Sequence, residues 1–147
     1  MRLASPAETE AAGLALACML QPGDVIAISG ELGAGKTAMA RGIAHGLGFG
    51  GEVSSPTFPI ILVYDEPDMR LPLWHVDLYR IENAASIDEL GLDEAREYAA
   101  LVIEWPERLG ARLWPDSLRL MLQVISDGER ALTAMVPPAW EGRWPLR

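Results

Sequence analysis

Residues 30–37 read Gly-Glu-Leu-Gly-Ala-Gly-Lys-Thr, and this stretch decides the expected fold. It fits the pattern G-x-x-x-x-G-K-[ST], in which a glycine-rich turn points backbone N–H groups at phosphate oxygens. An apolar run of strand character (residues 24–29) precedes it, and a helical pattern from Thr37 to about Leu47 follows. The start of that helix adds its partial positive charge to an anion site. We therefore expect a P-loop for an ATP-type triphosphate, with Lys36 at the β- and γ-phosphates and Thr37 coordinating Mg²⁺.

The remaining segments predict one α/β domain. Ser5, Pro6 and Glu8 form a helix start with a capping box, and Gln21-Pro22-Gly23 ends that helix. Cys18 lies in its apolar pattern, so we expect a small buried side chain there. Further along, the expected elements are an antiparallel strand pair (60–64 and 73–79), short helices interrupted at Gly91 (87–98), a buried strand (101–103) and a hairpin turning at Asp127-Gly128 (118–124 with 131–136).

The predicted fold is therefore a single P-loop NTPase-like domain over residues 1–147, with a mixed, mostly parallel sheet flanked by helices and an antiparallel hairpin near the C-terminus. Residues 136–147 carry Trp140 and Trp144, and both a packed and a mobile arrangement of this tail are open.

Composition narrows the functional classes. The net charge is −9 and no Lys/Arg cluster occurs, which argues against strong direct nucleic-acid binding. No apolar run approaches the length of a membrane span, and the N-terminus lacks a signal-peptide layout, so we expect a cytoplasmic protein. The single cysteine excludes an intrachain disulfide. Of the 12 basic residues only Lys36 is a lysine, and it falls inside the P-loop pattern.

Two carboxylates are candidates for catalysis and for Mg²⁺. Asp77 and Glu104 each follow an apolar strand, and ligands of parallel α/β sheets gather at those strand ends. Hydrolysis needs such groups to hold the metal and orient the attacking oxygen. A capping or salt-bridge role is the alternative for each.

Other polar and aromatic residues leave two interpretations open. Ser55 and Thr57 offer hydroxyls on a switch-like loop or belong to a plain turn. His75 shares a strand face with Asp77, and a buried structural role is favoured for it; His45 is expected at the surface or in the core. Trp105 either packs in the core or covers the nucleotide.

Five segments together go beyond a generic P-loop. Residues 30–37, Ser-Pro-Thr-Phe at 55–58, His-Val-Asp-Leu-Tyr-Arg at 75–80, Leu-Gly-Leu-Asp-Glu at 90–94 and Ile-Glu-Trp at 103–105 resemble the TsaE family in order and spacing. That family comprises ATPases required for threonylcarbamoyladenosine biosynthesis on tRNA, and the resemblance spans roughly residues 5–136. It implies a P-loop α/β fold and a slow, Mg²⁺-dependent ATPase stimulated by a TsaB–TsaD complex, which itself performs the threonylcarbamoyl transfer.

The resemblance also implies roles for individual residues. Those at the triphosphate are Gly33, Ala34, Gly35, Lys36, Thr37 and Ala38, with Lys36 contributing to catalysis. Thr37 and Glu104 are implied as Mg²⁺ ligands and Asp77 as the water-orienting carboxylate. Trp105 is placed close to the nucleotide, and Thr57 in the switch-like loop.

The chain departs from the family pattern at two positions. Ala38 stands where members often carry a second hydroxyl. Members can also place an arginine directly after the hairpin glycine, whereas here Gly128 is followed by Glu129 and then Arg130, so contact of Arg130 with the nucleotide is an open question. The adenine pocket is expected near Pro6.

Two other functional classes compete with an ATPase acting on a protein complex. A small-molecule kinase usually carries extra basic residues in a lid, and this chain has no second lysine. A nucleotide-gated scaffold would bind ATP without useful turnover, and the presence of both Asp77 and Glu104 counts against it.

Overall fold

The computed structural model describes residues 1–54 and 60–146, apart from the side chain of Ala84. The predictions for Ser55 and Thr57 lie outside the described residues. In the described part of the chain, one seven-stranded sheet has the order β1-β7-β6-β2-β5-β4-β3.

The centre of the sheet is parallel. β2 (Val25–Ser29) lies between β5 (Ala100–Glu104) and β6 (Leu118–Ser126) and is parallel to both, and β4 (Leu73–Asp77) is parallel to β5. Antiparallel pairs close the two sides: β3 (Ile61–Tyr64) with β4, β6 with β7 (Glu129–Met135), and β7 with β1 (Arg2–Leu3). The predicted mixed, mostly parallel sheet and its late hairpin are confirmed. β1 was not expected, because two residues are too short to show a period-two pattern.

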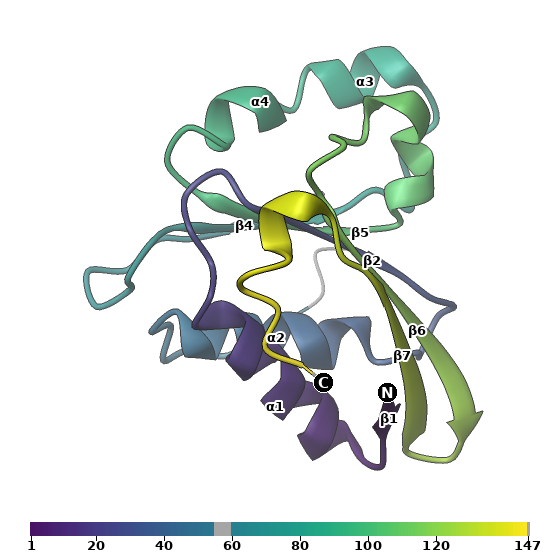
Figure 1. Cartoon of the computed structure of the whole chain (residues 1–147). Coiled ribbons are helices and arrows are strands. Elements are labelled where there is room, and N and C mark those ends of the chain that lie inside the picture. Colours follow the sequence, from purple (N-terminus) through teal and green to yellow (C-terminus); the bar gives the residue numbers. More distant parts are fainter. Residues whose placement is uncertain (55–59, 147) are drawn as a thin grey trace.

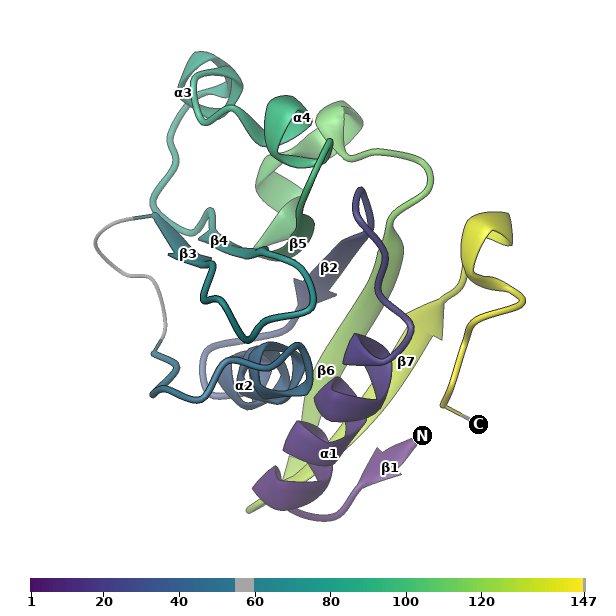
Figure 2. The ribbon, with the colours of Figure 1, turned by 90° about the vertical axis from the view of Figure 1, so that its left-hand side faces the viewer.

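Helices cover both faces of the sheet (Figures 1 and 2). α1 (Pro6–Ala17) and α2 (Lys36–Gly46) cover one face. α3 (Ala84–Asp88), α4 (Leu92–Ala95) and the short 3₁₀ turns η1 (Pro106–Arg108) and η2 (Gly110–Arg112) lie over the other. No helix among residues 1–54 and 60–146 is long and apolar enough to cross a membrane.

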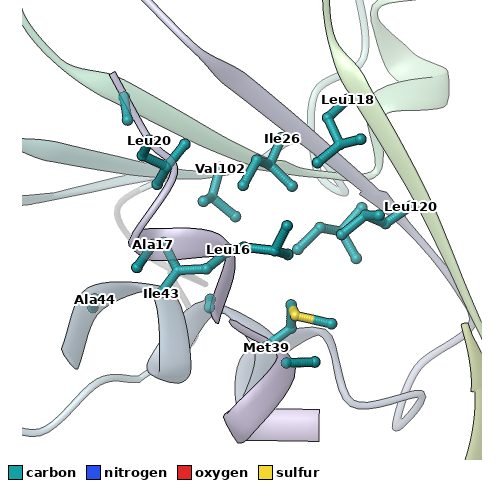
Figure 3. Close-up of a cluster of buried hydrophobic side chains, with 14 of the residues drawn as sticks. Leu16, Ala17, Leu20, Ile26, Met39, Ile43, Ala44, Val102, Leu118 and Leu120 are labelled. Atoms are coloured by element: carbon teal, nitrogen blue, oxygen red, sulfur yellow. The ribbon is translucent and has the colours of Figure 1, made fainter. Parts of the chain in front are cut away.

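Each face has its own apolar core. Under α1 and α2, Leu16 and Ile43 pack on Ile26 and Val102 from the sheet (Figure 3). On the opposite face, residues such as Leu101 pack with the apolar side chains of α3 and α4. Because β2 and β5 are buried on both faces, their sequences are continuous apolar runs rather than alternating ones.

The predicted start of α1 is confirmed. The Ser5 hydroxyl accepts the backbone N–H of Glu8, and the Glu8 carboxylate accepts the N–H of Ala4, so two N–H groups at the helix start are satisfied. The prediction for Cys18 is wrong: it caps the C-terminus of α1 and is exposed. Leu16, Ala17 and Leu20 face the core at this end, which leaves Cys18 on the solvent side.

Glycines bring α1 and α2 unusually close together. A Cβ built on Gly13 would lie 2.3 Å from the Met39 carbonyl oxygen, and one on Gly42 only 2.0 Å from that of Glu10. The backbones therefore touch where a larger residue would separate them. This contact seats α2, and with it the P-loop, against α1.

The C-terminal segment packs against the start of β2. Trp140, in η3 (Pro138–Trp140), is fully buried, and Arg143 lies 4.2 Å over its ring. Arg143 forms two hydrogen bonds with the Asp24 carboxylate, at 2.6 and 3.0 Å, and a third with the Met19 carbonyl.

Candidate functional site

A cavity of about 460 Å³ opens at the carboxyl ends of β2, β4 and β5. Its walls hold P-loop residues (Leu32, Gly33, Gly35, Lys36, Thr37), strand-end residues (Asp77, Glu104), and Ile60, Tyr79, Arg80 and Trp105. The structure thus brings seven of the predicted site residues to one cavity. Ala34, Ala38, Pro6 and Arg130 do not line it.

The P-loop backbone needs glycine at two of its turns. Gly35 has a φ of +99° and forms the N-cap of α2, so the first amides of the helix open towards the cavity. At Gly30, with a φ of +155°, a Cβ would lie 2.7 Å from the Leu122 carbonyl oxygen. These positions allow the loop to curl over the sheet edge and present a helix N-terminus to an anion.

Lys36 is buried at the floor of this loop. The residue is only 5% exposed, its Nζ donates to the Gly30 carbonyl at 2.6 Å, and it lies 4.0 Å from the centroid of the Trp105 ring. Burial lowers the pKa of Lys36, while nearby Glu104 and Asp77 act to raise it. The result is a desolvated ammonium group that an anion in the cavity would meet with little competing water.

Trp105 packs on the core, one of the two roles that the sequence left open, and it also lines the cavity. It is the one non-glycine residue with positive φ (+58°) in residues 1–54 and 60–146, a conformation that costs free energy for a bulky side chain. The turn comes directly after β5 and places the indole over Lys36 and 4.9 Å from the ring of Tyr79. Trp105 also packs on the apolar core of the α3–α4 face.

Asp77 and Glu104 are neighbours across β4 and β5, as their register shows. Asp77 Oδ1 accepts the N–H of Tyr79 at 3.0 Å. Burial raises the pKa of Asp77, and the charge of Glu104 adds to the rise. A carboxylate with a raised pKa is a better proton acceptor near neutrality, which suits an activating base.

Glu104 is almost fully buried and bound by a histidine. It is 3% exposed, and its Oε2 lies 2.6 Å from Nε2 of His75, which is completely buried. The predicted burial of His75 is confirmed, whereas its pairing with Glu104 was not foreseen. A sequence signal existed, because His75 lies opposite Val102 in the register and so shares a sheet face with Asp77 and Glu104.

Arg130 reaches the P-loop, although it does not line the cavity. Its Nε donates to the Ala34 carbonyl at 3.0 Å and its Nη2 to the Gly33 carbonyl at 2.9 Å. Glu129, which precedes it, pairs instead with Arg2 at 2.7 Å. Pro6 lies beside the hairpin turn, where a Cβ on Gly128 would be 3.9 Å from its Cδ.

Two further residues with polar groups, Tyr79 and Arg80, line the cavity, and the sequence pattern at 75–80 predicts no role for either of them. They follow Asp77 directly, so the strand end that positions the carboxylate also delivers them to the cavity. His45 lies elsewhere, half-buried on α2, with its Nε2 3.0 Å from the Gly51 carbonyl.

The residues of the cavity fit Mg²⁺ bound together with phosphates. Within the described ranges, no group of three His, Cys, Asp or Glu side chains could hold a metal ion. Mg²⁺ usually binds through one or two carboxylates plus substrate phosphates, and keeps several waters. Thr37, Asp77 and Glu104 on one cavity supply the oxygen donors for this mode.

Comparisons with known proteins agree on one family. The family model described as threonylcarbamoyl adenosine biosynthesis protein TsaE matches residues 3–132. The tRNA threonylcarbamoyladenosine biosynthesis protein TsaE of Bacillus subtilis (strain 168) is 39% identical over 133 residues, covering 90% of this chain and 82% of that protein. Its namesake from Streptomyces coelicolor is 42% identical over 111 residues, covering 75% of each chain. The crystal structure of Bacillus subtilis YdiB matches with a TM-score of 0.81 at 35% identity, covering 97% of this chain and 88% of that one.

Proposed function

This chain belongs to the TsaE family, and from that premise we propose that it is a Mg²⁺-dependent ATPase required for threonylcarbamoyladenosine formation on tRNA. The observation that carries the proposal is the desolvated Lys36 ammonium at the floor of a P-loop cavity, with two carboxylates on the facing strand ends. The names of the relatives support the role in threonylcarbamoyladenosine formation, and the residues of the cavity support ATP binding and hydrolysis.

Triphosphate binding follows from the N-terminus of α2. The amides of its first turn have no partner within the helix, and Gly33 and Gly35 line the cavity, so backbone donors would meet an anion there; Lys36 adds a full positive charge. To meet a phosphate, the Lys36 ammonium would exchange its hydrogen bond with the Gly30 carbonyl for a charged one.

Thr37 and Glu104 would hold Mg²⁺, whose charge offsets that of the phosphates when it is bound. Asp77 would orient the attacking water and accept its proton, in keeping with the raised pKa of this carboxyl group. Trp105 and Tyr79 form an aromatic wall that would limit the access of bulk water to the reacting groups.

The partner we propose is a TsaB–TsaD-type complex, which performs the transfer to tRNA. The net charge of −9 disfavours direct binding of RNA phosphates by this chain. Several arginines are also bound to carboxylates of the same chain, namely Arg2, Arg96, Arg112 and Arg143. These pairings likewise disfavour a small-molecule kinase with a basic lid.

The test is the content of threonylcarbamoyladenosine in tRNA from cells that lack this protein. We expect the modified nucleoside to disappear, to return with the wild-type protein, and to stay absent with Lys36→Ala. Unchanged content in the deletion strain would contradict the proposed pathway. Label moving from γ-labelled ATP to a small acceptor rather than to water would favour a kinase, and full rescue by Lys36→Ala would favour a scaffold.

A further inference from the structure

A buried histidine–glutamate pair lies behind the cavity wall. His75 on β4 is completely buried and Glu104 at the end of β5 is 3% exposed, and their side chains approach to 2.6 Å between Nε2 and Oε2. The other ring nitrogen, Nδ1, is buried and has no hydrogen-bond partner among the described residues. None of the roles assigned above uses this histidine.

The unpartnered Nδ1 decides where the proton lies. A 2.6 Å contact between Nε2 and a carboxylate oxygen requires a proton between them. If Glu104 were the donor, or if the ring were doubly protonated, Nδ1 would carry a buried N–H without an acceptor, which is rarer in proteins than an acceptor without a donor. The arrangement that leaves no orphaned donor places the proton on Nε2 of His75, which donates it to Oε2 of Glu104.

This hydrogen bond restricts the carboxylate. A free glutamate side chain has several rotamers, and ordering it on ligand binding costs conformational entropy. Here Oε2 is committed to His75 before any ligand arrives, which favours Oε1 as the oxygen that meets a ligand in the cavity.

We propose that His75 is a positioning residue that holds Glu104 oriented for Mg²⁺. The inference rests on the proposed function, because it takes Glu104 as a ligand of Mg²⁺ bound with ATP. Hydrogen-bonded partners of metal ligands typically change metal affinity or activity about 10–100-fold when removed. The effect of His75 should therefore appear in the Mg²⁺-dependent part of nucleotide binding and leave the phosphate contacts of Lys36 intact.

The experiment compares His75→Leu with His75→Gln. Leucine removes the donor and keeps an apolar side chain of similar bulk, while the glutamine amide restores an N–H donor at similar reach. His45→Leu is the matched control, because His45 is the only other histidine in the chain and does not line the cavity. Affinity for a non-hydrolysable ATP analogue is measured by calorimetry in EDTA and in Mg²⁺, and thermal unfolding checks that each variant folds.

We expect all variants to bind the analogue equally in EDTA, within about twofold. The gain in affinity on adding Mg²⁺ should fall about 10–100-fold in His75→Leu, recover to within a few-fold in His75→Gln, and stay at the wild-type value in His45→Leu. An unchanged Mg²⁺ gain in His75→Leu would overturn the inference. So would an equal loss of affinity in EDTA, or a His75→Gln variant as weak as His75→Leu, since both would mark a packing role.

A second measurement needs no nucleotide. Nitrogen-15 NMR of the wild-type ring should show His75 protonated on Nε2 and bare on Nδ1, and the opposite tautomer would refute the assignment even if His75→Leu failed to fold. A wild-type protein that binds no nucleotide would overturn the proposed function and this inference with it. Mg²⁺-dependent nucleotide binding that is the same in the wild type and in His75→Leu would overturn this inference and leave the proposed function standing.

Discussion

Replacing Gly42 with alanine should destabilise the protein, although alanine is normally the better helix former. Gly42 lies within α2, and its added Cβ would sit 2.0 Å from the Glu10 carbonyl oxygen and 3.0 Å from the Leu14 nitrogen in α1. Both neighbours are backbone atoms, so relief requires the two helices to separate. That movement would loosen the contacts of Leu16 and Ile43, which are fully buried between the helices and the sheet.

The magnitude follows from two opposing effects. Overpacking of a close-packed interior costs about 1–3 kcal/mol, and backbone overlap at this distance belongs at the upper end. The gain in helix propensity from glycine to alanine offsets about 1 kcal/mol. We therefore expect a net loss of about 2 kcal/mol in the free energy of unfolding, or about 4–8 °C in Tm for a chain of this size.

Urea and thermal unfolding, followed by circular dichroism, measure this loss. Gly50→Ala is the matched control, because a Cβ there meets nothing within 4 Å and should change stability by less than about 0.5 kcal/mol. A Gly42→Ala protein as stable as the wild type or more so would refute the reasoning. It would mean that the interface between α1 and α2 can relax without loss.

Three further predictions address the site and the surface. Asp77→Asn should raise Tm at pH 7, because burial raises the pKa of Asp77 in the folded state and so makes its ionised form costly. The gain should shrink on acidification, as the wild-type carboxyl also becomes protonated, and a gain that grows on acidification would contradict this. Arg130→Ala should weaken Mg²⁺–ATP binding about 5–10-fold in calorimetry, because the carbonyls of Gly33 and Ala34 lose their anchor, and unchanged affinity would refute that role. Cys18 should react with a thiol reagent in the native protein within minutes, and protection until unfolding would contradict its exposure.

The sequence predicts local elements of this fold well. The P-loop pattern and the continuous apolar run before it define β2 and α2 within one residue. Ser5 and Glu8 carry the capping chemistry of α1, and Asp127-Gly128 carries the turn of the hairpin. Each of these features depends on residues close together in the chain, so its physical cause is visible in the sequence.

Features that depend on distant residues were harder to predict. Gly13 and Gly42 look unfavourable within helices until the close contact of α1 and α2 is known. The apolar pattern around Cys18 could not show which side of the helix end faces the core. Arg130 binds the P-loop across 96 positions of sequence, a contact that only the folded hairpin creates.

The same limit applies within the candidate site. Strand ends indicated Asp77 and Glu104, because the topology of a parallel sheet brings such ends together. The pairing of His75 with Glu104 depends on the register of β4 against β5, which the sequence did not define. Trp105 has a left-handed backbone at the turn after β5. Positive φ is normally indicated by glycine, so a tryptophan at this position gives no sign of it in the sequence.

The most direct test of the account is ATP turnover by the purified protein, alone and with a TsaB–TsaD complex, with Lys36→Ala as the blank. We predict slow hydrolysis by the protein alone, strong stimulation by the complex, and loss of both in the variant, since Lys36 is the only lysine and lies in the P-loop. Equal rates with and without the complex, or full stimulation in Lys36→Ala, would contradict a partner-gated ATPase.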